Sequence, residues 1–591
     1  MSTDQIILFS LFAVVFVFLL WGRWRYDLVA FIALIIALVL GVVPTEDAFS
    51  GFGHPATIIV GLVLIVSRGL VNSGAIDIIT RKVTAMDLKL SRHISAMSGI
   101  GAILSAFMNN VAALALLMPV DLQAAKKKER SPRITLMPLA FATILGGMIT
   151  LIGTPPNIII ASYREQALGE AYGMFDFAPV GLTCSVIGIA FVALFGWKLI
   201  PRKDSGKDPG SELMELEDYI AELVVPEGSS AVGLKVRELD SQAEDADVSI
   251  IGLVRQKRRF SGYARHIEIQ AGDVLILEAG PQELDQFRGA LKLEFAGEKR
   301  HEKVASGGMS LMEVVVPQNA LIEGRSALSL KLLLRHGVTL LGVSREGTRF
   351  RERVRRLQIE AGDILLLLGP SERLEGVANW LGVLPLAERG LSVTQYKRAG
   401  LAIGVFSAAI LAASFGWLYL AVALAIVVAA YVLLEIVPLQ EVYHQVEWPV
   451  IVLLGSMIPL GTALEQSGGT ELIASQLVGL TEGLPVMVVL TVLMIVIMTL
   501  SDVLNNTATA VVGAPIAVEV ASKLNVNPDP FLMAVAVAAS CAFLTPIGHK
   551  NNTLIMGPGG YKFGDYWRMG LPLEILIVAI SVPTILIFWP L

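Results

Sequence analysis

Two clusters of small polar residues interrupt long apolar stretches of the sequence. The first, Met108-Asn109-Asn110, lies inside residues 93–123, and the second, Asn505-Asn506-Thr507, lies inside residues 484–523. Asn side chains and the carbonyl groups released at a helix break are oxygen ligands of the kind that bind sodium, and half-helix N-termini attract anions. The two clusters, called the first and second tip below, therefore predict an anion site flanked by cation sites.

Each tip is followed by a second candidate break that contains Thr and Pro. The residues are Gly153-Thr154-Pro155-Pro156-Asn157 in the first half and Leu544-Thr545-Pro546-Ile547-Gly548 in the second half. Irregular backbone at membrane depth is tolerated only where protein encloses it or where it lines a water-filled cavity. Two tips and two Thr-Pro breaks in the same order therefore favour a site at the middle of a membrane protein.

The same order of motifs indicates an internal repeat. The tips align when Ser105–Ala113 is set against Asp502–Ala510, which pairs Asn109 with Asn506. A weaker similarity joins Ser67–Ala75 to Leu460–Gly469. Five spans in each half would make the second repeat run opposite to the first, which is typical of secondary transporters.

The composition requires a membrane. The chain has 591 residues, of which 54% are hydrophobic and only 17% are charged, whereas a soluble protein carries roughly 25% charged residues. Runs of about 20 apolar residues, long enough to span a bilayer as helices, fill both ends of the chain. We predict an α-helical polytopic protein with membrane repeats at 1–201 and 396–591, each containing a re-entrant hairpin, at 93–123 and 484–523. The predicted spans are about 4–21, 26–43, 56–75, 134–162, 176–200, 398–415, 417–436, 447–465, 529–556 and 570–590.

Basic residues predict the orientation. Lys and Arg cluster after the first, third and fifth spans and after the first hairpin, but are absent from Pro44–Asp47. The positive-inside rule then places residues 202–396 in the cytoplasm and both termini outside, in a plasma or bacterial inner membrane. The first apolar run has no basic n-region and no small-residue cleavage site, so we interpret it as a retained span. The net charge of −6 argues against nucleic acid, and Cys184 and Cys541 lack metal-ligand spacing.

The segment between the repeats contains a second internal duplication. Glu222–Pro226 recurs as Glu313–Pro317, and Ile267–Leu277 recurs as Leu357–Leu367. Short β-branched runs bounded by Ala-Gly-Asp turns predict strands, and Ser326–Leu334 predicts a helix. We predict two α/β domains, at 212–298 and 308–388. Each resembles the regulatory TrkA-C (RCK-C) domain, which implies a homodimer and a possible nucleotide ligand. A dimerisation module without a ligand is the alternative, because no Gly-rich phosphate loop is present.

The membrane halves resemble the divalent anion/sodium symporter family of the ion transporter superfamily. The resemblance rests on the paired tips and on the Gly146–Asn157 stretch. It implies sodium-coupled symport of a small divalent anion by alternating access. The implied anion ligands are Asn109, Asn110, Thr154, Pro155, Asn506, Thr507, Thr545 and Pro546. The implied sodium ligands are Ser105, Asn109 and the Gly153 backbone at one site, and Ser501, Asn506 and the Leu544 backbone at the other.

Departures from the family pattern leave the substrate open. The first tip lacks the family's Ser and Thr, and the second has Asn505 in place of Ser. Sulfate is therefore as plausible as a dicarboxylate. Proton-coupled anion transport and metalloid (arsenite-type) efflux are alternatives within the superfamily. A channel would need a carbonyl filter loop, which the sequence does not contain, and no pairing of nucleophile and base indicates an enzyme.

Charged residues inside apolar stretches are candidates for coupling or gating. Arg68 lies inside the third predicted span, and Asp502 lies just before the second tip. Ionisable residues at such depth are costly and are functional hypotheses by default. A structural ion pair between the two is the simplest alternative. His549 and Lys550 follow the second break, where they either attract the anion or mark the cytoplasmic exit.

Overall fold

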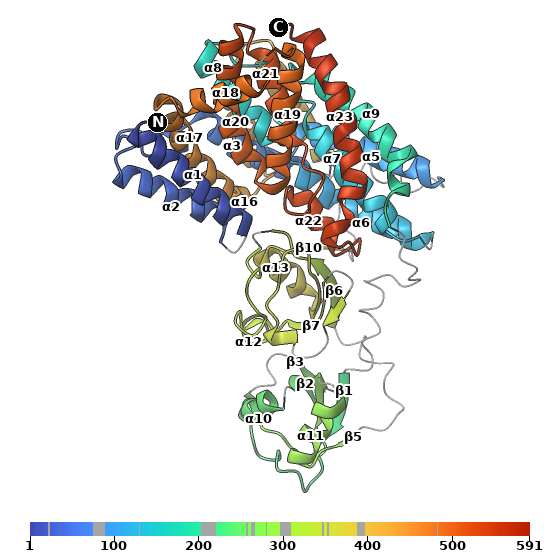
Figure 1. The fold of residues 1–591 in the computed structure, drawn as a ribbon. Coiled ribbons are helices and arrows are strands. Elements are labelled where there is room, and N and C mark those ends of the chain that lie inside the picture. The colour runs from blue at the N-terminus through green and yellow to red at the C-terminus, as the bar shows by residue number, and fades with distance from the viewer. Residues whose placement is uncertain are drawn as a thin grey trace.

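The computed structural model describes most of the chain. The described residues are 1–21, 24–74, 89–128, 130–201, 220–246, 248–255, 258–261, 266–278, 281–295, 309–318, 320–345, 348–350, 354–386, 396–481 and 483–591. Figure 1 shows a layer of long helices built from the two ends of the chain, with two small α/β domains suspended below it. The predominantly helical, apolar architecture predicted from the sequence is confirmed.

The helices of the first half begin and end close to the predicted apolar runs. Five helices among the described residues are long and apolar enough to cross a membrane, and the remaining apolar helices are shorter. The helices of this half are α1 (Thr3–Trp21), α2 (Tyr26–Val39), α3 (Pro55–Asn72), α5 (Leu90–Phe107), α6 (Asn110–Lys127), α7 (Arg133–Gly147), α8 (Pro155–Leu168) and α9 (Ala178–Leu194).

The second half contains the same sequence of long helices and breaks. Its helices are α14 (Tyr396–Ser414), α15 (Leu420–Leu433), α16 (Leu439–Gln445), α17 (Trp448–Gln466), α18 (Gly469–Leu480), α19 (Val486–Val503), α20 (Asn506–Leu524), α21 (Asp529–Ser540), α22 (Lys550–Met556) and α23 (Trp567–Phe588). The two stretches predicted as single spans, 134–162 and 529–556, are each two helices separated by an irregular segment. Helices α16 and α18 were not predicted.

The irregular segments lie in the interior of the helical layer. Every residue of α21 is buried, and nearly every residue of α7 is. Helix α5 packs on α7 and α19 packs on α21, so the first helix of each hairpin covers the helix that precedes each break. Protein therefore covers most of both breaks, with Ile547 of the second break about half exposed. Such cover is the condition for non-helical backbone at membrane depth.

The segment between the membrane halves forms two five-stranded antiparallel sheets. The first sheet has the order β3-β2-β4-β1-β5, and the second has the order β8-β7-β9-β6-β10, which is the same topology. The strands and helices of the first are β1 (Ile220–Val224), α10 (Asp240–Asp245), β2 (Ser249–Arg255), β3 (Arg258–Ser261), β4 (Val274–Glu278), α11 (Pro281–Leu291) and β5 (Glu294–Phe295). Those of the second are β6 (Met309–Val315), α12 (Leu332–His336), β7 (Thr339–Arg345), β8 (Thr348–Phe350), β9 (Ile364–Pro370), α13 (Ser371–Leu381) and β10 (Leu384–Pro385).

The two sheets share their internal chemistry as well as their topology. Arg255 makes a bidentate pair with Asp273 at 2.7 and 2.8 Å, and Arg345 makes the equivalent pair with Asp363 at 2.8 Å. Both aspartates are buried in the Ala-Gly-Asp turns. The helix predicted at 326–334 is shorter than expected, because Lys331 has a φ of 53° and α12 begins only after it.

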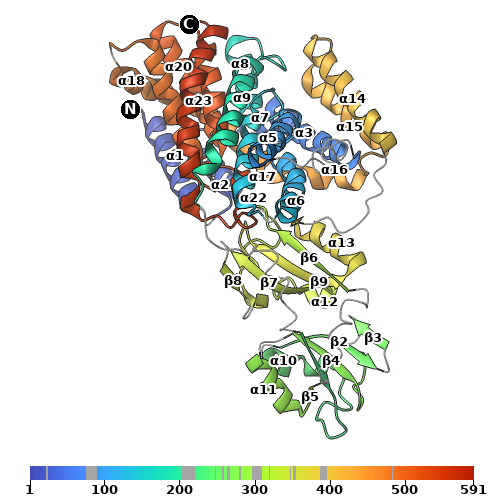
Figure 2. The ribbon, with the colours of Figure 1, turned by 90° about the vertical axis from the view of Figure 1, so that its right-hand side faces the viewer.

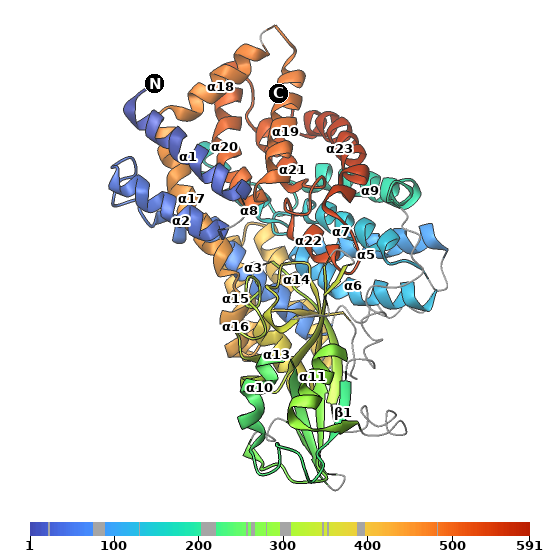
Figure 3. The same ribbon diagram turned by 60° about the horizontal axis from the view of Figure 1, so that its bottom comes forward.

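The second α/β domain lies between the helical layer and the first α/β domain (Figure 2). Gln318 Nε2 donates to Thr553 Oγ1 of α22 at 2.8 Å. The turn at Gly362 packs against α22, where Thr553 and Met556 are its neighbours. Figure 3 shows the strands of this domain close below α22 from a second direction. The equivalent turn of the first domain, at Gly272, has open space around it.

Candidate functional site

The two tips have the same backbone geometry. Helix α5 ends at Phe107, Met108 is extended and α6 begins at Asn110. Helix α19 ends at Val503, Leu504 is extended and α20 begins at Asn506. The two helix starts are therefore the equivalent positions of the two tips.

The hydrogen bonds that cap α6 and α20 show which residues of the two tips correspond. Asn109 Oδ1 accepts from the Val111 N–H at 2.9 Å, and Asn505 Oδ1 accepts from the Thr507 N–H at the same distance. Asn109 therefore corresponds to Asn505, and the expected alignment of Asn109 with Asn506 is wrong by one residue. The reason is that a single Asn at each tip serves as the helix cap. The first tip is Asn109-Asn110-Val111, and its residue equivalent to Asn506 is Asn110.

The breaks also match each other in a different register from the expected one. The hydroxyl of Thr150 donates to the carbonyl oxygen of Ala106, and the hydroxyl of Thr545 donates to that of Asp502 at 2.5 Å. Thr150 therefore corresponds to Thr545, and the expected pairing of Thr154 with Thr545 is wrong.

An asparagine closes each break in the same way. Asn157 Nδ2 donates to the Thr150 carbonyl at 2.9 Å, and Asn552 Nδ2 donates to the Thr545 carbonyl at 3.0 Å. The shared pattern is Thr-x-Ile-Gly-x-x-x-Asn, which begins at residues 150 and 545. In this register His549 is the counterpart of Thr154, since both precede the first residue of the helix that resumes after the break.

Contacts from both halves of the chain surround the first tip. Ser105 Oγ is hydrogen-bonded to the carboxamide of Asn110 at 2.6 Å, and His549 Nε2 lies 3.4 Å from the same carboxamide. Asn551 Nδ2 donates to the Asn110 carbonyl at 3.1 Å and to Thr143 Oγ1 at 2.8 Å. A Cβ at Gly147 would collide with the Asn110 side chain, so only glycine permits this approach.

The second tip lies beside buried carboxyl groups. Asp502 Oδ1 accepts from the Leu544 N–H at 2.9 Å, and Glu574 Oε1 accepts from the Phe543 N–H at 3.3 Å. The carboxyl groups of Asp502 and Glu574 are also within hydrogen-bonding reach of each other. Among the described residues, no N–H or O–H donor reaches Asp502 Oδ2. Two carboxyl groups this close in a buried site share a proton or a cation, because like charges in a medium of low dielectric constant repel strongly.

Some of the predicted ligand residues are free to contact a ligand, and others are already bonded to protein groups. The second break contacts the first tip through Asn551 and the residues just before the second tip through Thr545. Thr507, Asn110 and Thr154 are all buried. Thr154 Oγ1 has no hydrogen-bond partner among the described residues, so it remains available to a ligand. Pro155 is the first residue of α8, and Pro546 accepts from Thr553 Oγ1 through its carbonyl at 2.5 Å. Ser501 Oγ donates to the Ala539 carbonyl at 2.6 Å, while Asn506 makes only local contacts with Thr507 in the described structure.

The two charged candidates are not partners. Arg68 pairs with Glu441 of α16 at 3.1 Å, and about a third of each side chain is exposed. Asp502 contacts the break loop and Glu574 instead. Lys550 pairs with Glu447, which accounts for its charge without an anion. His549 is buried against the first tip, so the interpretation of this residue as a marker of the cytoplasmic exit is wrong.

Sequence reasoning missed Glu574, Asn551 and Asn552. The isolated Glu574 in the last apolar span was a usable signal, because an ionisable residue at such a position is rare. The recurrence of the Thr-x-Ile-Gly-x-x-x-Asn pattern was a signal for Asn552. Asn551 had none, because its counterpart in the first half is Pro156.

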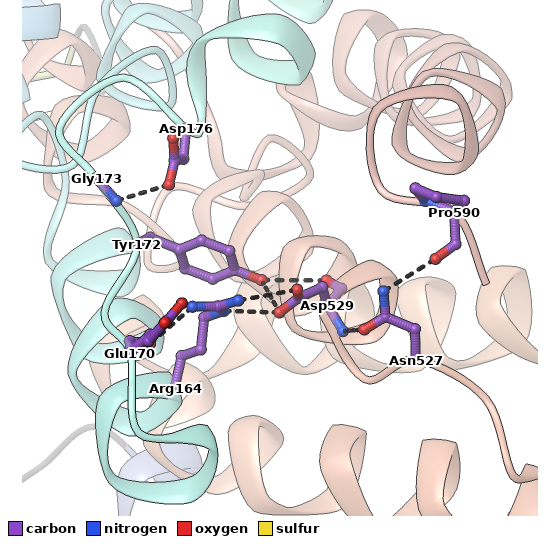
Figure 4. A network of polar contacts seen from close by, with 8 residues as sticks. All are labelled: Arg164, Glu170, Tyr172, Gly173, Asp176, Asn527, Asp529 and Pro590. Carbon is purple, nitrogen blue, oxygen red and sulfur yellow. Dashed lines mark hydrogen bonds and ion pairs between the residues drawn. The ribbon is translucent and has the colours of Figure 1, made fainter.

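Away from the tips, polar contacts join the halves beside a cavity of about 140 Å³. Tyr163 donates to Glu465 at 3.1 Å across that cavity, which α8, α17 and α20 help to line. Figure 4 shows the adjacent network, in which Arg164 and Tyr172 of the first half converge on Asp529 of the second. The Arg164 guanidinium makes two bonds to the Asp529 carboxylate, at 2.7 and 3.0 Å. These contacts fix the C-terminal half of α8 against the start of α21.

Paired broken helices in a polytopic helical layer define a membrane transporter, and known relatives agree with that class. The model of the citrate transporter family matches residues 16–523 and 492–591. The chain therefore belongs to the citrate transporter family. The family and the relatives described below are named as transporters and not as enzymes.

Three relatives illustrate the range of similarity. An uncharacterized transporter of Synechocystis is 30% identical over 93% of this chain and 92% of its own length. A probable sodium/sulfate cotransporter of Chlamydomonas reinhardtii is 23% identical over 55% of this chain and 38% of its own length. A sodium-dependent dicarboxylate transporter of Staphylococcus saprophyticus is 29% identical over 24% of this chain and 27% of its own length.

Proposed function

We propose that the protein is a secondary active transporter that carries a small divalent anion together with sodium by alternating access. The observation that supports this most directly is the meeting of the two halves at the first tip, where Asn551 and His549 contact Asn110. A site assembled from two repeats can be exposed to either side of the membrane by motion of one part against the other. Sulfate and dicarboxylates are the favoured anions, since relatives named for both are similar to this chain.

The proposed anion site lies between the tips and the breaks. Asn110, Asn506 and Thr507 are at the starts of α6 and α20, where the helix dipole favours an anion. Thr154 adds a buried hydroxyl without a partner in the described chain. Ser501, Asn506 and the Leu544 backbone are the proposed cation ligands at the second tip, because hydroxyl and carbonyl oxygens suit sodium.

The wider architecture is part of the same proposal. We propose that the membrane halves are inverted repeats, that the insert is cytoplasmic with the termini outside, and that the protein forms a homodimer. The shared topology of the two α/β domains and their Arg–Asp pairs support a duplicated TrkA-C-like module with a regulatory role.

Uptake into proteoliposomes tests the function. Purified protein is reconstituted, and labelled sulfate, succinate and citrate are offered with an inward gradient of sodium or of choline. Sodium-dependent uptake of one of these anions is the expected result. Absence of uptake for all three would reject the substrate class, and equal uptake in choline would reject sodium coupling.

Proton-coupled transport is a second candidate, favoured by the Asp502–Glu574 pair. Two carboxyl groups in contact hold one proton more readily than an isolated one. In that case the uptake measured above would follow an inward proton gradient in choline. Imposing the pH gradient without sodium separates the two candidates in the same vesicles.

A further inference from the structure

The Asn110 side chain of the first tip contacts protein groups at both of its polar ends, whereas a carboxylate oxygen beside the second tip has no such partner. Asn110 is contacted by Ser105 and by His549, which comes from the opposite half. Beside the second tip, by contrast, Asp502 Oδ2 is buried without a hydrogen-bond donor in the described chain, and Thr154 Oγ1 of the first break likewise has no partner there. His549 is where this asymmetry originates, since its counterpart in the first half is Thr154.

The position of the proton on His549 follows from its capping role. Its Nδ1 accepts from the backbone N–H of Asn551 at 3.1 Å and caps α22. An imidazole nitrogen that accepts a hydrogen bond carries no proton, so the ring holds its proton on Nε2. The Nε2–H group therefore points at the carboxamide of Asn110, 3.4 Å away.

The orientation of the Asn110 amide follows in turn. In the structure Ser105 Oγ donates to Asn110 Oδ1 at 2.6 Å, and Asn110 Nδ2 faces His549 Nε2 at 3.4 Å. With a proton on Nε2 two donors would face each other, so we assign the amide the opposite way round, with its oxygen toward the Nε2–H group and its NH2 group toward Ser105 Oγ. Both polar ends of the side chain are thereby occupied. A sodium ion at this tip would have to displace the Nε2–H group from the same amide oxygen. Asn551 Oδ1 lies in the same group of contacts and has no partner among the described residues, but one free side-chain oxygen does not make a cation site, so the residues present do not fit a cation there.

We propose that the Nε2–H group of His549 takes the place of the cation at the first tip, so that cation coupling runs through the second tip alone. The predicted number of sodium ions rests on the proposed sodium coupling, whereas the contact between His549 and Asn110 does not. The donor of a neutral imidazole supplies one hydrogen bond to the Asn110 oxygen. A sodium ion would instead supply a full positive charge. Because the imidazole donor occupies its place, the chain holds one cation fewer.

Sodium binding to the purified full-length protein tests this assignment without a known substrate. Equilibrium binding of radioactive sodium is measured for the wild type and for His549→Thr, which installs the residue found at the equivalent position of the first half. The expected stoichiometry is about one ion per chain for the wild type and about two for His549→Thr. His549→Gln keeps an N–H donor near Asn110 and is expected to stay near one. His336→Thr, the same substitution in the insert beside Trp380, is the matched control.

Each result of this measurement either supports or overturns the assignment of His549. Two ions in the wild type, or an unchanged stoichiometry in folded His549→Thr, overturns the assignment. If His549→Thr does not fold, His549→Gln and the wild type still decide, because two ions in either would overturn it. No binding in the wild type together with one ion in His549→Thr would reject sodium coupling but support the role of His549. No binding in any variant would overturn both.

Discussion

Asn551 donates from its side chain to the carbonyl oxygen of Asn110 at 3.1 Å, which joins the second break to the first tip. The two residues are 441 positions apart in the chain and are both buried. Any motion that separates the two halves at the site must break this bond or carry both residues together. The contact is therefore a point where binding at one half can affect the other.

Replacing Asn551 tests that coupling. Asn551→Ala removes the donors to Asn110 and Thr143, and unpaired buried acceptors cost on the order of 1–3 kcal/mol. We expect transport to fall at least about tenfold, as a 1.4 kcal/mol loss implies, while the protein remains in the membrane. Asn72→Ala, which removes hydrogen bonds to Ile436 and Glu441 at the rim, is the control and should transport normally. Wild-type uptake by Asn551→Ala would remove this bond from the mechanism.

The register of the tips makes a sharper prediction. Asn109 and Asn505 are helix caps, and serine is as good a cap as asparagine. Asn109→Ser and Asn505→Ser should therefore keep most of the transport activity. Asn110→Ser removes the carboxamide that contacts Ser105 and His549, and Asn506→Ser removes a proposed cation ligand. We expect a loss of transport of about tenfold or more for each, because buried polar groups lose their partners. Uptake and thermal stability are measured for all four variants, and the opposite order of activities would restore the alignment of Asn109 with Asn506.

The Asp502–Glu574 pair predicts a difference between two substitutions of one residue. Glu574→Gln supplies an amide N–H to Asp502 and can keep the bond from Phe543, so it should fold normally. Glu574→Ala removes the partner of the buried Asp502 carboxyl group and the acceptor of the Phe543 N–H, which costs on the order of 1–3 kcal/mol. The midpoint of thermal unfolding in detergent should be well below the wild-type value for Glu574→Ala and close to that value for Glu574→Gln. Equal midpoints for the two variants would contradict a stabilising contact.

Much of the architecture was predictable because it depends on local patterns. Apolar runs indicate helices, and paired polar interruptions indicate the tips, since both follow from the cost of exposed backbone in lipid. The strands of the insert followed from its repeated Ala-Gly-Asp turns. The correct register of the tips was not predictable from matching letters, because Asn109 and Asn110 are the same residue type. Only the hydrogen bond from Val111 to Asn109 distinguishes the cap from the residue that faces the site.

Contacts between the two halves were even harder to predict from the sequence. His549 and Lys550 are neighbours in sequence and look alike as charged candidates. In the structure one caps a helix at the first tip and the other pairs with Glu447. The partner of Arg68 was equally difficult to predict, since Glu441 lies on the short helix α16, which contains no apolar run. Long-range pairs of this kind depend on the packing of the whole fold, which no local pattern encodes.

The contact between the insert and α22 leads to the last prediction. A Cβ at Gly557 would collide with the carbonyl oxygen of Gly362, and the backbone of Gly557 is helical, so Gly557→Ala adds bulk without backbone strain. We expect this variant to separate the second α/β domain from the helical layer. Since Thr553 bonds both to Gln318 and to the Pro546 carbonyl, separation should also loosen the second break.

Hydrogen exchange measures both effects in one experiment. Gly557→Ala should accelerate exchange at 360–363 and 543–553, with a change in uptake. Gly362→Ala and Gly272→Ala form a matched pair, because both glycines have a φ of 88° and carry the same strain, but only Gly362 faces α22. Exchange in 543–553 should rise for Gly362→Ala and stay at the wild-type level for Gly272→Ala. An equal rise in both would attribute the effect to strain within the α/β domains, and no rise in Gly557→Ala would show that the insert does not restrain the break.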